Sequence, residues 1–410
     1  MQKILLFIAS LFYFNSLFAK NEIKSWQGIH ETPLSRLEQQ FADPPVEFAN
    51  HVIWGWEGKM DKKTICNDLD SIKKKGFRAV IFEAGYKLPF KYLSEEWFKA
   101  IRTGVLEAKK RGMKVWIIDE GKYPSGFAGG KFSQERPDLR MQALVIGDTI
   151  QVKRGEVMTN HKIAPEIISA VAVSTSGAPN RTVAINNGEI SFNAGLDDWK
   201  ILLVKSDFRT AVTRAVNNPN GGKDATNSLC DYLNPVAVQQ FIDWTHEQYK
   251  KYLGKELGTT VLGFRGDEPD YAHLPWTPSI VQTFKDTKGY DPTPYLASFF
   301  TTSPTIQEQR VKADYWDVWS SLFATHFFKL QADWCAANGV AHITHLNKEH
   351  EMPACVKAEG DYFRNLSKVQ IPGVDAIWNQ IWPGTLNDFP KLASSVAHVY
   401  GKPRAFSESF

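Results

Sequence analysis

The sequence predicts an α/β fold: a (β/α)₈ barrel of the triosephosphate isomerase type, incomplete at its C-terminus and interrupted by an inserted antiparallel β module. Three observations support this prediction. Short apolar runs alternate with amphipathic helical patterns before residue 141, β-type runs without helices between them fill residues 141–226, and the alternation then resumes. Strands that alternate with helices in this way form a parallel sheet, because each crossover helix returns the chain to the same end of the sheet.

The first βα units have clear boundaries. Asp61 and Ser94 each precede a helical pattern, where their side chains can accept a hydrogen bond from a first-turn N–H. Gly76 and Gly112 follow these two helices, since glycine readily adopts the left-handed conformation that ends many helices. The first three strands are therefore expected at residues 51–56, 77–82 and 113–118.

The inserted module, residues 141–226, has the pattern of short antiparallel strands. Its β-type runs are residues 143–150, 168–174, 182–185 and 201–204. Asn187-Gly188 favours a tight hairpin turn, because both residues tolerate a positive φ. Residues 217–227, rich in Asn and Gly, are expected to form the loop that leads back to the barrel.

The second part of the barrel begins at Asn234-Pro235, a helix cap followed by proline at the first helical position. Helices are expected over 235–253, from 277, and over 306–337 and 387–399, with strands at 260–264, 340–345, 374–378 and 404–406. These seven strands leave an eight-stranded barrel one unit short, and an apolar seventh strand would be an open edge. We therefore expect residues 20–410 to be a catalytic barrel domain that lacks its last unit and belongs to a longer protein.

The composition argues against nucleic acid as a partner. The 48 basic and 45 acidic residues give a net charge of +3, so no basic surface is predicted. Aromatic residues make up 13% of the chain and include 13 Trp. Aromatic faces stack on the apolar faces of sugar rings, which favours a carbohydrate partner. The composition indicates no oligomeric state.

The N-terminus has the pattern of a signal peptide. Lys3 supplies the positive charge, residues 4–14 are almost all apolar, and Ala19 is a small residue before a cleavage site. We expect residues 1–19 to direct export to the periplasm or the extracellular medium. No run reaches the roughly 18 apolar residues of a membrane span. Export is compatible with a disulfide between Cys335 and Cys355, and the four cysteines match no metal-binding spacing.

Two glutamates are the candidate catalytic residues. Glu268 follows the strand at 260–264, which Pro269 prevents from continuing, and Glu408 follows the strand at 404–406. Strands four and seven lie across the mouth of an eight-stranded barrel, where barrel enzymes carry their catalytic groups. Two carboxylates there can flank one glycosidic bond, one as acid and the other as base or nucleophile. The alternative is an acidic loop in which Glu268 pairs with Arg265.

Further polar and aromatic residues at strand ends are candidates for binding the substrate. They are Trp54, Trp56, Glu83, Asp119, Glu120, Asp267, His345, Asn347, Asp375 and Trp378. In sugar sites, aromatic rings supply stacking area and polar groups fix the orientation of the ligand. The run from His345 to Glu351 has no recognised metal-site spacing, so no metal ligand is predicted from it.

Several stretches resemble the α-L-rhamnosidase-type glycoside hydrolases, family 106 and its relatives. The most specific are residues 118–130, with Tyr123-Pro124-Ser125-Gly126 at their centre, and the final stretch 407–410, Ser-Glu-Ser-Phe. Trp54-Gly55-Trp56 is similar to the family's first strand, and Glu268 with residues 276–278 and 289–291 is similar to its acid-bearing strand and the helices behind it. The likeness covers residues 52–410.

The resemblance implies a (β/α)₈ catalytic domain that removes a terminal deoxy sugar with inversion, with calcium near the site. It implies Glu268 as the acid and leaves Glu408, Asp375 and Glu351 as candidates for the base. No cofactor is evident from the residues themselves. The alternative function is a non-catalytic carbohydrate-binding protein on a degenerate barrel. Aromatic residues suit both functions, and only the carboxylate pair separates them.

Overall fold

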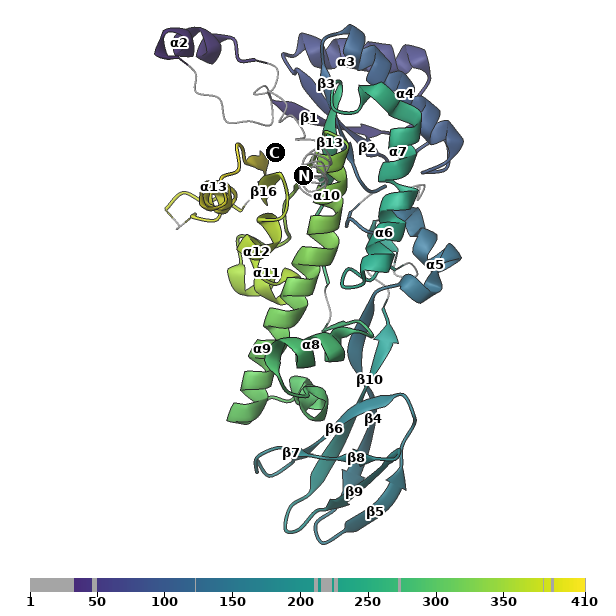
Figure 1. Cartoon of the computed structure of the whole chain (residues 1–410), viewed down its shortest axis with the longest axis vertical. Coiled ribbons are helices and arrows are strands. Elements are labelled where there is room, and N and C mark those ends of the chain that lie inside the picture. The colour runs from purple at the N-terminus through teal and green to yellow at the C-terminus, as the bar shows by residue number, and fades with distance from the viewer. Residues whose placement is uncertain are drawn as a thin grey trace, which may run out of the picture.

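The computed structural model describes residues 33–45, 50–121, 123–209, 213–214, 223–224, 228–271, 274–378, 380–384 and 387–409. A parallel sheet is the centre of this structure (Figure 1). Its strands, in their order across the sheet, are β1 (His51–Trp56), β2 (Ala79–Ala84), β3 (Lys114–Ile118), β13 (Val261–Gly266), β15 (Ala341–Thr344), β16 (Ile371–Asp375) and β17 (Phe406–Glu408). Spatial order therefore follows chain order, as in a (β/α) barrel.

The sheet is open in the part of the chain that the structure describes. β1 and β17 are its two edges, so the predicted parallel α/β sheet is confirmed but a complete barrel is not shown. The inner face carries apolar side chains, among them Ile81, Trp116 and Leu262. A cavity of about 740 Å³ follows this face and is lined by residues of both edge strands. The inner face therefore remains accessible between β1 and β17.

Helices cover the outer face of the sheet. Those that share an apolar core with its first strands are α3 (Lys62–Lys74), α4 (Glu95–Lys110) and α7 (His246–Leu253), and α6 (Pro235–Trp244) comes directly before α7. The predicted caps are confirmed: Asp61 accepts from the Thr64 N–H at 2.9 Å, and Ser94 accepts from the Trp97 N–H at 3.3 Å. The helix expected over 235–253 is instead broken at Thr245, whose φ and ψ are −112° and −84°.

One long helical segment is continuous, as predicted for residues 306–337. It consists of α9 (Ile306–Leu322), a π-helical turn (Phe323–Phe328) and α10 (Lys329–Ala337), and begins at a capping box formed by Thr305 and Glu308. The other α-helices are α2 (Leu34–Ala42), α5 (Lys131–Glu135), α8 (Ile280–Lys288), α11 (Met352–Glu359), α12 (Tyr362–Leu366) and α13 (Pro390–Val399). No described helix combines the length and apolar character required to cross a bilayer.

The inserted region forms antiparallel sheets that extend away from the parallel sheet (Figure 1). Its strands are β4 (Gln142–Val152), β5 (Val157–Lys162), β6 (Ile167–Ser174), β7 (Arg181–Thr182), β8 (Ile185–Asn186), β9 (Glu189–Asn193), β10 (Trp199–Phe208), β11 (Thr213–Arg214) and β12 (Lys223–Asp224). Asn187 and Gly188 have φ values of 50° and 75° between β8 and β9, the expected hairpin turn. β14 (Pro275–Trp276) pairs with β4 and joins the two parts.

Some local expectations need correction, and others fall outside the described residues. β16 begins at Ile371 rather than Val374, because Pro372 and Gly373 belong to the parallel ladder although both residues are usually strand breakers. β17 is shifted to Phe406–Glu408. The disulfide between Cys335 and Cys355 that export would allow is not formed, since both thiols are free and buried. The signal-like segment, residues 1–19, lies outside the described residues, as does most of the exit loop 217–227.

Candidate active site

The C-terminal ends of the parallel strands surround a cavity of about 540 Å³. Parallel strands place the residues that follow them at one end of the sheet, so segments distant in sequence meet there. The cavity is lined by Ile53, Glu83, Tyr123, Arg265, Asp267, Glu268, Asn347, His350, Asp375, Ile377, Trp378, Gln380 and Glu408. Both predicted catalytic glutamates are in this set.

Glu268 lies two residues beyond the end of β13 with a φ of 38°. This left-handed conformation is unfavourable for a residue with a side chain, and such strain is concentrated at functional sites. Burial raises the pKa of the Glu268 carboxyl to about 8; the charge of His345 opposes this rise, and that of Asp267 adds to it. Asp375 shares a hydrogen bond with Glu268, and its own pKa is also raised, chiefly by burial. Glu268 is therefore protonated at neutral pH.

Glu408 ends β17 and has the opposite ionisation. Its Oε2 accepts hydrogen bonds from Arg265 Nη2 and from His345 Nε2, the latter at 3.0 Å. Burial tends to raise the pKa of this carboxyl, but the hydrogen bond from His345 and the charge of Arg265 outweigh it and lower the pKa below the ordinary value. Glu408 is therefore a carboxylate at neutral pH. Arg265 forms ion pairs with Glu408 and with Asp267, the latter at 3.4 Å. The alternative in which Arg265 pairs mainly with Glu268 is therefore wrong.

His345 connects the two glutamates. Its Nδ1 lies 2.9 Å from the Leu346 carbonyl oxygen and donates to it, which turns Nε2 toward Glu408 at 3.0 Å and Asp267 at 3.2 Å. Burial lowers the pKa of His345, but the hydrogen bonds with Asp267 and Glu408 raise it well above its ordinary value overall. The ring therefore carries a positive charge among carboxylates. Glu268, His345 and Asp375 also lie close together, with one polar atom of each within 4.8 Å of the others.

Five residues predicted to bind substrate line the cavity: Glu83, Asp267, Asn347, Asp375 and Trp378. The Asn347 amide donates to the Tyr123 hydroxyl at 3.2 Å, which orients both polar groups at the wall. Trp378 is 69% exposed with a φ of 51°, so its indole stands at the rim where a sugar ring could stack on it. His345 is not in the lining but acts on it through Glu408 and Asp267.

Four residues predicted to bind substrate lie elsewhere. Trp56 is fully buried behind the sheet, 5.7 Å from the ring of Trp97, and the partly buried Trp54 packs against the same core. Strand alternation explains this correction, because both side chains face the covering helices rather than the mouth. Asp119 and Glu120 are also fully buried.

These two acidic residues organise the loop after β3. Asp119 accepts from the Ser125 hydroxyl at 2.7 Å, and the Ser125 oxygen in turn accepts from the Asp267 N–H at 2.6 Å. Glu120 accepts from the backbone N–H groups of Gly121, Ala128 and Gly129. Their carboxylates therefore support the cavity wall from behind instead of contacting a ligand.

Sequence reasoning missed several residues that line the cavity. Arg265 was considered only as a partner of Glu268, and Tyr123 only as part of the glycine-rich stretch, whereas both line the cavity. The signal for Arg265 was available, because a charged residue inside an otherwise apolar strand needs a buried carboxylate partner. Ile53, His350, Ile377 and Gln380 had no comparable signal.

The described groups at the mouth do not fit the calcium that the resemblance implies. Calcium takes six to eight oxygen ligands. Here each cluster of possible ligands at the mouth includes the His345 imidazole, and Glu408 and Asp267 already face the Arg265 guanidinium. These carboxylates are already paired with the protein's own cations, so no chemical step is assigned to calcium.

Comparisons with known proteins indicate a family of glycoside hydrolases. The sequence model of glycoside hydrolase family 106, α-L-rhamnosidase, matches residues 170–410. A protein of Formosa agariphila named "Putative beta-glucuronidase" is 24% identical over 466 residues, covering 100% of this chain and 37% of its own length. The solved structure of a rhamnosidase from Novosphingobium sp. PP1Y superposes with a TM-score of 0.66 at 16% identity, over 92% of this chain and 53% of that chain. The chain thus spans about half or less of the length of these relatives.

Proposed function

The chain belongs to the α-L-rhamnosidase family of glycoside hydrolases, family 106, and we propose that it hydrolyses the bond to a terminal sugar with Glu268 as acid and Glu408 as base. The observation that carries this proposal is the opposite ionisation of two carboxyl groups lining one cavity. Burial keeps Glu268 protonated, whereas His345 and Arg265 keep Glu408 ionised. Glycosidases require one carboxyl group of each kind beside the bond that breaks.

In the proposed reaction, Glu268 gives its proton to the glycosidic oxygen as the bond from that oxygen to the anomeric carbon breaks. Glu408 takes a proton from a water molecule, whose oxygen forms the new bond to the anomeric carbon from the opposite face. The products are a free sugar of inverted configuration and the alcohol that left, and a proton has moved from Glu268 to Glu408. Exchange with solvent restores both groups. Inversion rests on the family resemblance.

The charge of the cavity supports a neutral sugar as the substrate. The ionised Glu408 and the further carboxyl groups of Glu83, Asp267 and Asp375 line it, against the guanidinium of Arg265. That guanidinium is 2% exposed and already contacts two carboxylates. A uronate would bring another negative charge next to these groups without a free cation to receive it. We therefore favour a neutral deoxy sugar such as rhamnose over a glucuronic acid residue.

The test uses the protein with aryl α-L-rhamnosides and aryl β-glucuronides as parallel substrates. We expect hydrolysis of the rhamnoside, and proton NMR of the first product should show the anomer opposite to that of the substrate. Cleavage of only the glucuronide would overturn the neutral-sugar assignment. Retained configuration would overturn the role of Glu408 as a base. Sugar binding measured by calorimetry without turnover of any glycoside would favour the non-catalytic function.

We also propose that the protein is exported. The support is the charged, apolar and small-residue pattern of residues 1–19. N-terminal sequencing of the protein from its native cells should give Lys20 as the first residue. A first residue of Met1 or Gln2 would contradict export through this segment.

A further inference from the structure

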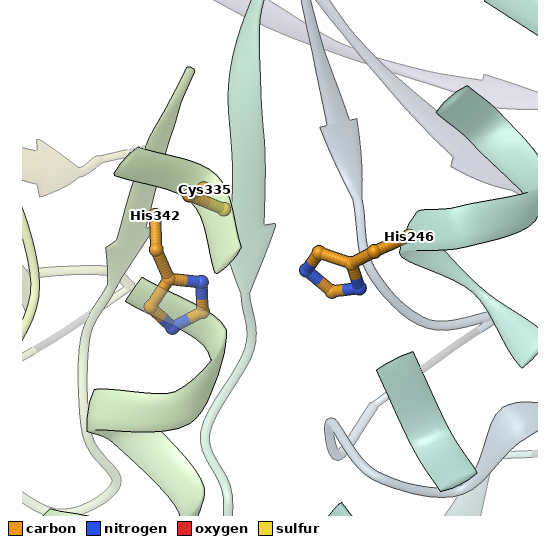
Figure 2. Close-up of side chains that lie close together, drawn as sticks. All are labelled: His246, Cys335 and His342. Atoms are coloured by element: carbon orange, nitrogen blue, oxygen red, sulfur yellow. The ribbon is translucent and has the colours of Figure 1, made fainter. Parts of the chain in front are cut away.

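Three side chains that commonly bind metals meet between the parallel sheet and its outer helices, away from the active-site cavity. His246 is the first residue of α7, Cys335 lies in α10 and His342 lies in β15. Figure 2 shows the three side chains converging from these separate elements. One ligand atom of each lies within 4.8 Å of the others, and all three residues are buried.

Three of the four ring nitrogens in this cluster lack a hydrogen-bond partner among the residues that the structure describes. Neither ring nitrogen of His342 has one, and neither does Nε2 of His246. Both residues are at most 1% exposed, so bulk water does not satisfy them. Leaving a buried polar group unpaired costs about 1–3 kcal/mol, and native proteins rarely accept this cost without a function for the group. The unpaired nitrogens of His246 and His342 therefore indicate a missing ligand.

The hydrogen bonds of the Thr245 hydroxyl determine which ring nitrogen of His246 carries the proton and which has a free lone pair. The Thr245 hydroxyl donates its only hydrogen to the Phe241 carbonyl oxygen at 2.7 Å. Its oxygen must therefore accept from His246 Nδ1, which lies 2.9 Å away. Nε2 is then unprotonated, and Figure 2 shows it on the side of the ring that faces His342. A hydrogen bond that fixes the ring from its other nitrogen in this way is typical of metal-binding histidines.

The surroundings favour uncharged imidazoles and exclude water. Burial lowers the pKa of His342 to about 3 and that of His246 well below its ordinary value. The ring of His246 contacts Phe264 and Trp334, at centroid distances of 4.3 and 5.1 Å.

We propose that His246, Cys335 and His342 form a structural site for a thiophilic d¹⁰ cation, Zn²⁺ or Cu⁺. Two imidazoles and a thiolate select such ions over calcium or magnesium. Binding replaces the Cys335 thiol proton, which leaves for solvent, and needs no change of oxidation state. Bond lengths of about 2.0–2.3 Å put ligand atoms about 3.3–3.6 Å apart, so atoms that lie within 4.8 Å of one another close by at most about 1.5 Å on loading. The ion would tie α7 and α10 to β15.

The test compares the full chain with Cys335→Ala and with Cys355→Ala, a matched control because Cys355 is also a free, buried cysteine in a helix. Each protein is produced with zinc and copper in the medium, and its metal content is measured by mass spectrometry. Each is then stripped with a chelator and titrated with Co²⁺, whose bond to a thiolate gives a charge-transfer absorption band. Thermal unfolding is followed before and after stripping.

We expect about one equivalent of zinc or copper in the unmodified chain and in Cys355→Ala, and none in Cys335→Ala. Zinc alone identifies Zn²⁺ as the resident ion, and copper alone identifies Cu⁺. The cobalt band should be absent only in Cys335→Ala, and stripping should lower the Tm of the other two proteins. If Cys335→Ala does not fold, the band and Tm shift of the unmodified chain decide the question. The proposed site would be overturned if the unmodified chain showed neither the cobalt band nor the Tm shift. It would also be overturned if Cys335→Ala contained as much metal as the unmodified chain.

Discussion

His345 Nε2 lies 3.0 Å from Oε2 of Glu408, and this contact links the end of β15 to the end of β17. The same nitrogen lies 3.2 Å from Asp267, so one charged ring serves two carboxylates. The contact lowers the pKa of Glu408, while Glu268 stays protonated because its burial outweighs the attraction of the same ring. The positive charges of His345 and Arg265 beside Glu408, and the burial of Glu268, therefore separate the ionisation of the two glutamates.

The first prediction concerns the acid. Glu268→Gln cannot donate a proton, so kcat on glycosides with alcohol leaving groups should fall by roughly 10²–10⁴-fold. Substrates with acidic phenol leaving groups need little protonation and should be affected much less. Steady-state kinetics on both substrate types measure the difference. Glu95→Gln is the control, because that carboxylate is on the surface and should leave both rates unchanged. Equal losses on both substrates would show that Glu268 is not the acid.

The second prediction concerns the base. Glu408→Gln should reduce kcat on both substrate types, because water must be activated whatever group leaves. The comparison with Glu268→Gln uses the same two substrates. Azide is a nucleophile that needs no base to activate it. On glycosides with alcohol leaving groups, added azide should therefore restore turnover more in Glu408→Gln than in Glu268→Gln. Full activity of Glu408→Gln would make Asp375, another carboxyl group in the lining of the cavity, the next candidate for the base.

The third prediction concerns the pH profile. Activity should fall as pH rises through about 8, because Glu268 loses the proton it must donate. It should also fall at low pH when Glu408 becomes protonated, and the lowered pKa of Glu408 places this limb below the ordinary glutamate range. His345→Gln removes a charged donor to Glu408, so the acidic limb of kcat/KM should move to higher pH. An unchanged acidic limb in that variant would contradict the role of His345.

The fourth prediction concerns stability and its dependence on pH. The pKa of Glu268 is raised from 4.5 to about 8 by folding, so between these values the folded state binds more protons than the unfolded state. The contribution of this group to stability is therefore lost as pH rises through that window. Glutamine at position 268 does not titrate, so the variant does not lose this contribution. The free energy of unfolding of Glu268→Gln minus that of the unmodified protein should therefore increase from about pH 5 to about pH 8. Urea denaturation at both pH values measures this, and a constant difference would contradict the raised pKa.

The fifth prediction separates two tryptophans that the sequence treated alike. Trp56→Ala opens a cavity in the core and should destabilise the protein by about 3–5 kcal/mol. Trp378→Ala, at a position 69% exposed on the rim, should leave stability nearly unchanged but raise KM. Thermal unfolding and steady-state kinetics on the two variants check both parts. An unaltered KM in Trp378→Ala would remove this side chain from the substrate site.

The sequence by itself determined the features that depend on neighbours a few residues away. The caps at Asp61 and Ser94, the turn at Asn187-Gly188 and the parallel order of strands were predictable, because capping, turn conformation and alternation of elements are local properties. The placement of Glu268 and Glu408 at strand ends followed from the same alternation. Pro372 and Gly373 misled the prediction of β16, since local preference is overridden where neighbouring strands supply the hydrogen bonds.

Only the tertiary structure decided the environment of each side chain. Burial gives Glu268 its proton, and the contact of Glu408 with His345, 63 positions earlier in the chain, keeps that carboxylate ionised. The approach of His246 to Cys335 and His342 likewise requires a helix, a second helix and a strand to pack together. Desolvation and charge pairing, which set the pKa values, depend on residues that are close in space. The periodic pattern of a sequence shows which face of an element is apolar, but it does not show which distant residue that face will contact.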